Sequence, residues 1–281
     1  MRKFDYVFLS KLVLPDRLSS LLACLHQLQA EERRLPGVMA EDVVKAVEHL
    51  EGRALPEYAL AIKKINGGWA DMSPSKEGLF SLVQLALPGT AWESEKKSLV
   101  LDQAFSAYLD NEKAGVDPLL RIPCLMLDIL CIAPFSTVST AAALLLARHL
   151  LYRSGFAICG SIPFEEMVLR YRYFYQQAFL EAGKHWEENG NDYLPYIEMV
   201  LSLLYLGSRA SQLRPGSRRG AKRASIEMLV LSSVLPISKA EICQALPHIS
   251  PTTVEAVLGT MVRNGMVRKV GASRAARYIR A

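Results

Sequence analysis

The sequence predicts a mostly α-helical protein whose last quarter is a smaller unit that combines helices and strands. Apolar residues recur at three- and four-residue spacing from residue 14 to residue 206, which is the period of a helix. A polar, basic segment that contains Gly and Pro interrupts this pattern at 208–225. After it, short helical patterns give way to alternating residues at 266–270 and 277–281, which are typical of strands.

The first part of the chain is predicted to form a series of amphipathic helices. In the first of them, leucines between Leu18 and Leu28 share one face, and Pro36 and Gly37 end the pattern. Gly52 ends the second helix in the same way. The helices predicted here span 14–35, 41–50, 56–65, 79–87 and 99–109.

The second part of the helical region is more apolar. Helices are predicted at 119–132 and 140–153, on either side of a short loop, and both are expected to be buried. Pro123 is expected near the first helical turn, where proline is tolerated. An aromatic-rich helix at 163–182 and an apolar helix at 193–206 complete the series.

Beyond the basic segment the chain has signals for three short helices and a hairpin. The first helix is predicted at 224–234. The second, at 238–246, opens with Ser238 and Glu241 in the spacing of a capping box. The third, at 250–264, begins with a serine cap and has a proline at its first position. Because two strands follow, this part is predicted to be a winged helix-turn-helix.

The predicted organisation therefore has three parts. Residues 1–207 form a helical domain, 208–224 a basic linker and 225–281 a winged-helix domain. No apolar run reaches the roughly 18 residues that a membrane span needs. The five cysteines are odd in number and widely spaced, so we expect reduced thiols in a cytoplasmic protein without a membrane partner.

Charge is distributed unevenly along the chain. The formal net charge is +5, but residues 209–281 hold 13 Lys and Arg against three Glu and carry +10, which leaves −5 elsewhere. A basic unit attached to a mildly acidic one is typical of a nucleic-acid-binding module. DNA is therefore the predicted partner.

In a helix-turn-helix the second helix enters the major groove with its N-terminal end first. Basic residues at the end of that helix and in the wing are expected to meet phosphates. An alternative is a protein-interaction module whose basic residues are only solvated. The residues predicted to contact DNA are Thr252, Thr253, Glu255, Arg263, Arg268, Lys269, Arg274 and Arg277, together with Arg218, Arg219, Lys222 and Arg223 upstream.

Four stretches between residues 117 and 206 resemble a Fic domain, the helical fold of AMP-transferring enzymes. They are DPLLRIPCLMLDILCIAPF, AAALLLARHLLYRSGF, SIPFEEMVLRYRYFYQQAFLEAG and NDYLPYIEMVLSLL. The resemblance covers a core of about 90 residues, 117–206, and is weaker before Asp117. It implies a Fic-like helical bundle, and a Fic core followed by a winged helix is an arrangement known in the family.

The Fic motif runs His-Pro-Phe-x-Asp/Glu-Gly-Asn-Gly-Arg-x-x-Arg. In the family the His accepts a proton, the acid holds Mg²⁺, and the Gly-Asn-Gly backbone and the arginines hold phosphates. Here only Pro134 and Phe135 match. The degenerate positions are Ala133 for the His, Ser136 for the variable residue, Thr137 for the acid, Val138, Ser139 and Thr140 for Gly-Asn-Gly, and Ala141 and Leu144 for the arginines.

The degenerate motif implies a protein that does not transfer AMP and has no catalytic residues, metal ligands or cofactor in this loop. One hypothesis is that a small anion or a nucleotide still binds at the 136–141 turn, because helix N-termini favour anions. The favoured interpretation is that the hydroxyls of this turn cap the helix. Glu51 and Gly52 loosely resemble the family's inhibitory motif, although a solvent-facing Glu at a helix end is the favoured interpretation.

The combined prediction is a DNA-binding regulator with a catalytically degenerate Fic-like domain. That domain is expected to form a homo-oligomer, sense a ligand or bind a protein partner. Two alternatives remain open at this point. One is a protein-interaction scaffold without a DNA target, and the other is a Fic protein that still binds nucleotide or transfers AMP.

Overall fold

The protein is mostly α-helical, as the sequence predicts. The computed structural model describes residues 2–30, 38–67, 72–135, 138–156, 160–211, 218–233, 236–247, 249–271 and 276–280. Within these ranges no helix has both the length and the apolar composition that crossing a bilayer requires. The helices of the body, as we name residues 2–211, are α1 (Phe8–Lys11), α2 (Asp16–Ala30), α3 (Ala40–Glu51), α4 (Tyr58–Asn66), α5 (Lys76–Ala86), α6 (Glu95–Lys113), α7 (Pro118–Ile132), α8 (Ser139–Arg153), α9 (Phe164–Arg170), α10 (Arg172–Ala182) and α11 (Leu194–Ser211).

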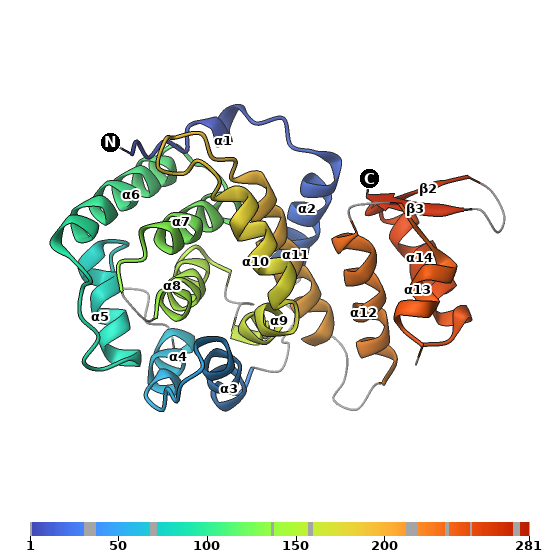
Figure 1. The fold of residues 1–281 in the computed structure, drawn as a ribbon, viewed down its shortest axis with the longest axis horizontal. Coiled ribbons are helices and arrows are strands. Elements are labelled where there is room, and N and C mark those ends of the chain that lie inside the picture. Colours follow the sequence, from blue (N-terminus) through green and yellow to red (C-terminus); the bar gives the residue numbers. More distant parts are fainter. Residues whose placement is uncertain are drawn as a thin grey trace.

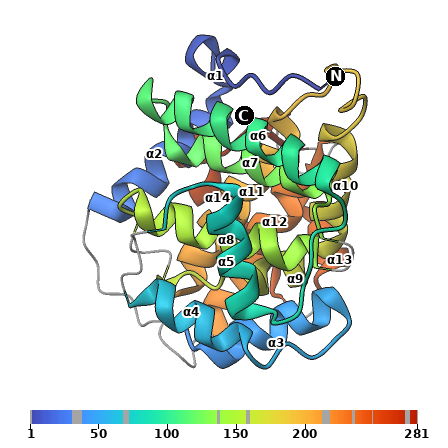
Figure 2. The ribbon, with the colours of Figure 1, turned by 90° about the vertical axis from the view of Figure 1, so that its left-hand side faces the viewer.

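Helix α8 lies at the centre of the body. Helices α3, α4, α5 and α7 all pack against it, and Figure 2 shows it surrounded by them. Every residue from Ala141 to Leu151 is buried. Such a helix has no solvent-facing stripe, which explains why its sequence is apolar almost throughout.

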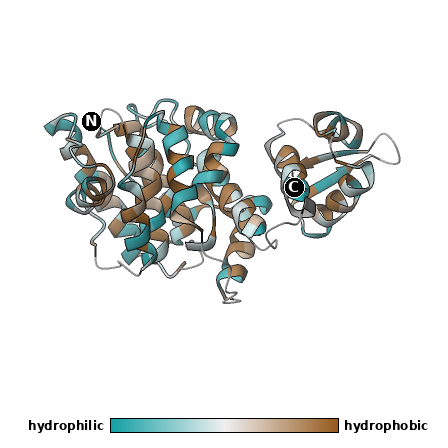
Figure 3. Cartoon of the chain, turned by 90° about the horizontal axis from the view of Figure 1, so that it is seen from below, coloured by the Kyte–Doolittle hydropathy of each residue, from teal (hydrophilic) through white to brown (hydrophobic). Residues whose placement is uncertain are grey.

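The C-terminal unit contains the elements that the winged-helix prediction requires. These are α12 (Arg218–Ser232), β1 (Ile237–Ser238), α13 (Lys239–Ala245), α14 (Pro251–Arg263), β2 (Val267–Val270) and β3 (Arg277–Arg280). The strands form an antiparallel sheet in the order β1-β3-β2. The predicted capping box of Ser238 and Glu241 is present, and Ser250 caps α14. Apolar residues face the interiors of both the body and this unit (Figure 3).

Helix α12 joins the two parts of the molecule. It packs against α11 of the body on one side and α14 on the other (Figure 1). Ile226, Val230 and Leu231 are buried in these contacts. The predicted basic linker at 208–224 is helical at both ends, because α11 continues to Ser211 and α12 starts at Arg218.

Other differences from the predicted elements have local causes. The single helix expected at 163–182 is two helices that meet at Tyr171, where φ is −110° and ψ is 27°. Pro123 occupies the sixth position of α7, beyond the first turn, so one backbone hydrogen bond is absent there. Helix α1 and strand β1 are short additions that the sequence pattern does not reveal. The last residues of the predicted helix 14–35 lie outside the described ranges.

Candidate functional site

The loop between α7 and α8 begins with an unusual backbone conformation. Ala133 ends α7 with φ 46° and ψ 63°, in the left-handed region, and its N–H bonds to the Ile129 carbonyl. A residue with a Cβ pays roughly 1–2 kcal/mol for this conformation. Lys97 Nζ donates to the Ala133 carbonyl over 3.1 Å, and Glu93 N donates to the Pro134 carbonyl over 2.9 Å. These contacts from outside the loop hold its carbonyls in place.

An aromatic stack covers the same loop. The Trp92 ring lies between Phe135 and Phe80, with centroid distances of 4.9 Å and 5.0 Å and interplanar angles of 15° and 21°. Phe135 is only 1% exposed. Phe135, which matches the Phe of the motif, therefore holds the loop in the core, against the segment that precedes α6.

The remaining positions of the degenerate motif are mostly buried. Ala141 and Leu144, which stand where the family has arginines, are 0% exposed and belong to the core cluster. Val138 is buried as well, while Ser139 and Thr140 are half-buried. Apolar side chains thus fill the positions that would grip phosphate. Ser136 and Thr137 lie outside the described residues.

A carboxylate from another helix caps α8. Glu51 Oε1, at the end of α3, accepts a hydrogen bond from Ala141 N over 2.7 Å. Glu51 is half-buried, and burial raises the pKa of its carboxyl group. Gly52 follows with φ 68° and ends α3. Glu51 is therefore not the solvent-facing residue that the sequence favoured.

The hydroxyl groups of the described part of the turn do not cap α8. Its N-cap is Val138, which offers no side-chain acceptor, and Ser139 Oγ donates to the Phe135 carbonyl over 2.9 Å. Glu51 supplies the negative charge that a helix N-terminus favours. An anion that reached the Ala141 N–H would have to displace this carboxylate.

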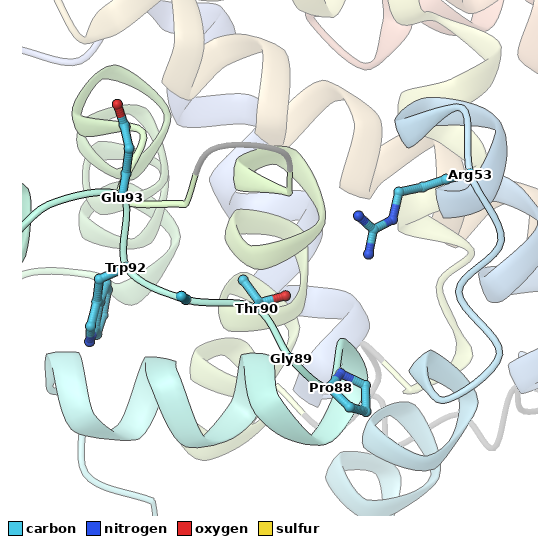
Figure 4. Close-up of a pocket in the computed structure, with 7 residues that line it drawn as sticks. Arg53, Pro88, Gly89, Thr90, Trp92 and Glu93 are labelled. Carbon is cyan, nitrogen blue, oxygen red and sulfur yellow. The ribbon is translucent and has the colours of Figure 1, made fainter.

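A pocket of about 440 Å³ opens beside this arrangement, lined by Arg53 and residues 88–93. Figure 4 shows Arg53 and Thr90 on opposite sides of the pocket and the Glu93 side chain directed away from it. Arg53 is exposed. Among the residues that the structure describes, no three His, Cys, Asp or Glu side chains are grouped to hold a metal ion.

The start of helix α14 presents few groups that could recognise bases. Thr252 and Glu255 are exposed, but Glu255 pairs with Lys239 at 2.5 Å, and this contact lowers the pKa of the Glu255 carboxyl group. Thr253 Oγ1 lies 2.8 Å from Ser250 Oγ. The sequence gives no signal for the pairing of Lys239, because its partner Glu255 lies 16 residues further along the chain.

Three of the predicted DNA contacts are exposed cations at the end of α14 and on strand β2. They are Arg263, Arg268 and Lys269, and none of them forms an ion pair with another described residue. Arg263 donates only to the neutral Thr260 hydroxyl.

The other predicted DNA contacts bond to groups within this chain, lie away from β2, or have side chains outside the described residues. Arg277 donates to the Pro236 carbonyl over 2.8 Å and pairs with Glu241, while Arg223 pairs with buried Glu227. Lys222 lies near the start of α12, at the opposite end of that helix from the β2–β3 hairpin (Figure 1). Because the ten residues that follow Lys222 in α12 rise about 15 Å, Lys222 lies away from the cations of β2. Arg218 and Arg219 begin α12, but their side chains, like all of Arg274, lie outside the description.

Comparison with known proteins supports the fold. No protein-family model matches the sequence, and no curated protein matches it. Among solved structures, the chain is similar to the crystal structure of a Fic family protein from Desulfovibrio desulfuricans G20, with a TM-score of 0.52 and 14% sequence identity. The alignment covers 96% of this chain and 97% of that one. The fold is therefore Fic-like, and the likeness extends well beyond residues 117–206.

Proposed function

We propose that the protein binds DNA through its C-terminal unit and that its Fic-like body does not transfer AMP. The three unpaired, exposed cations Arg263, Arg268 and Lys269 carry this proposal. They occupy the end of the recognition helix and the wing, where a winged helix meets the DNA backbone. The net charge of +10 over residues 209–281 adds a long-range attraction to the polyanion.

The chemistry of the motif loop supports the second half of the proposal. Ala133 has no group that could accept a proton, and Leu144 has none that could hold a phosphate oxygen. Removing a general base alone costs a factor of about 10² to 10⁴ in rate. The amine of Lys97, which lies next to Ala133, is bound to that residue's carbonyl and to Glu93.

The DNA proposal is tested by titrating the full-length protein into fluorescently labelled duplex DNA at several salt concentrations. Binding that weakens linearly with log salt is the expected result, with a slope of about −0.9 for each phosphate neutralised. No binding at 50 mM salt would contradict it and would favour the scaffold hypothesis.

The prediction about AMP transfer is tested by incubating the protein with labelled ATP and Mg²⁺, with and without acceptor proteins. No label that survives denaturation is the expected result. Specific labelling of an acceptor or of the chain itself would contradict the proposal. ATP-dependent thermal stabilisation without labelling would indicate a retained nucleotide site.

A further inference from the structure

A fully buried carboxylate lies in α7, away from the motif loop and the winged helix. Asp128 is 0% exposed and accepts hydrogen bonds from three neutral donors. Trp186 Nε1 donates to Oδ1 over 2.7 Å, Tyr193 Oη donates to the same oxygen over 2.9 Å, and Tyr6 Oη donates to Oδ2. A buried carboxylate held by neutral groups alone is costly, which favours a cation beside it.

Arg2 supplies that cation from the segment before α1. Its Nη2 lies 3.6 Å from Asp128 Oδ1, and its side chain is only 8% exposed. Nη1 donates to the Trp186 carbonyl over 2.9 Å, and Nη2 donates to Tyr193 Oη over 2.5 Å. Two separate nitrogens of one planar group therefore reach two acceptors, whereas the donors of an ammonium group all lie on a single nitrogen.

Aromatic rings enclose the same guanidinium group. Its central carbon lies 4.9 Å from the Trp186 ring centroid, 5.4 Å from that of Phe4 and 6.0 Å from that of Tyr193. Rings at these distances attract a cation through their quadrupoles, more strongly where water is excluded. The Asp128 carboxylate, the Trp186 carbonyl, the Tyr193 hydroxyl and the rings thus surround the guanidinium group, although the Arg2 Nε is buried without a hydrogen-bond partner among the described residues.

The segment that carries Arg2 lies at the surface of the body. Lys3, Asp5 and Val7 are exposed. A cleft of about 520 Å³ lies between this segment and α6, and Arg2 forms part of its lining. The cleft therefore reaches Arg2 itself, while Asp128 lies buried behind it.

We propose that Asp128, Trp186 and Tyr193 form a binding site for alkylguanidinium compounds, which the chain fills in cis with Arg2. A free ligand of this class, such as arginine, competes with Arg2 for the site. The charge of the Asp128 carboxylate attracts a guanidinium cation, whereas a neutral urea group of the same shape lacks this attraction. This site is independent of DNA binding and of the motif loop.

The experiment is a chemical rescue with the full-length protein. Arg2→Ala empties the site, and Lys3→Ala is the matched control because Lys3 is exposed and lies beside it. Thermal unfolding is followed with up to 10 mM methylguanidinium chloride, with N-methylurea as the neutral analogue. Ten millimolar guanidinium has little denaturing effect, since denaturant slopes are a few kcal/mol per molar.

The expected result is a lower Tm for Arg2→Ala that methylguanidinium restores in a saturable manner by about 2–4 °C. Wild type and Lys3→Ala, whose sites are filled, should respond much less, and N-methylurea should have no effect. Arg2→Gln, which retains more of the side chain, provides the same test if Arg2→Ala does not fold. The absence of saturable rescue in the variant that folds, or an equal response of Lys3→Ala, would overturn the proposal.

Discussion

The motif loop and the C-terminal unit differ in where their polar groups find partners. Around the loop, polar groups are bonded within the body, as Glu51 is to Ala141 N and Lys97 to the Ala133 carbonyl. On the C-terminal unit, Arg263, Arg268 and Lys269 face solvent, and none of them forms an ion pair with another described residue. Interactions already satisfied internally stabilise a fold, whereas unpaired exposed charges remain available to a partner.

The two regions also differ in what their residues contribute. In the motif loop and the start of α8, Ala141 and Leu144 are part of the core and contribute packing. In the C-terminal unit, several basic residues form ion pairs, yet three acids cannot neutralise thirteen cations. We therefore expect substitutions in the loop to change stability and substitutions on β2 to change DNA affinity.

The largest effect is expected at Phe135. Phe135→Ala removes the ring that stacks on Trp92 and leaves a cavity, which should reduce the free energy of unfolding by about 3–5 kcal/mol. Urea titrations measure this loss, with Tyr173→Ala as a control because that aromatic ring is 67% exposed. Below the unfolding transition, DNA affinity should be unchanged, and a parallel loss of affinity would show that the regions are coupled.

The next effect is expected in the wing. Replacing both Arg268 and Lys269 by Ala should weaken DNA binding roughly tenfold for each cation at 0.1 M salt and should reduce the salt slope by about 2. Stability should change little, because both side chains are exposed. Replacing Lys45 and Lys113 removes the same charge from the surface of the body. Equal losses of affinity in the two double variants would show that only net charge matters.

Titration of Asp128 should make the stability of the body depend on pH. Burial raises the pKa of its carboxyl group from 3.8 to about 6, despite the hydrogen bonds and Arg2, which lower it. Between these values the folded protein binds more protons than the unfolded chain. The contribution of this group is therefore complete below pH 4 and is lost as the pH rises through 6, by about 3 kcal/mol.

This pH dependence is measured as the difference in unfolding free energy between wild type and Asp128→Asn from pH 4 to pH 7.5. Wild type should lose stability relative to the variant as the pH rises. The other titratable groups near Asp128 are Tyr6, Tyr193, Cys124 and Cys131, and all four have a pKa raised by burial, so they remain neutral in this window. A constant or rising difference would contradict this assignment.

The smallest effect is expected at Glu51. Glu51→Ala leaves the Ala141 N–H without its acceptor and should cost about 1–2 kcal/mol, whereas Glu51→Gln keeps an oxygen acceptor and should cost less. Glu187→Ala is a suitable control because Glu187 is exposed. If neither Glu51 variant changes the urea midpoint, the carboxylate does not stabilise the start of α8.

Local signals in the sequence predicted a large part of this fold. The caps at Ser238 and Ser250 and the ends at Gly52 and Gly265 depend on neighbouring residues and are all present. The basic segment was misinterpreted because its Pro and Gly outweighed Arg, Lys and Ala, which are good helix formers. The break at Tyr171 interrupts a continuous aromatic pattern and has no signal of its own.

The candidate sites were less predictable than the elements, because they depend on pairs far apart in the chain. Glu51 and Ala141 are 90 residues apart, and Arg2 and Asp128 are 126 apart. The prediction that the motif loop lacks AMP-transfer chemistry rests on single residues of the sequence. The carboxylate that now caps α8, and the guanidinium beside Asp128, could be found only once the chain was folded.

We expect DNA to bind the C-terminal unit and no nucleotide to bind the motif loop. Amide hydrogen exchange of the full-length protein measures both regions in one experiment, with duplex DNA added in one sample and Mg²⁺-ATP in another. Slower exchange in α14 and β2 with DNA, and no change at 133–144 with ATP, is the expected result. Protection of the loop by ATP, together with no protection of α14 and β2 by DNA, would contradict it.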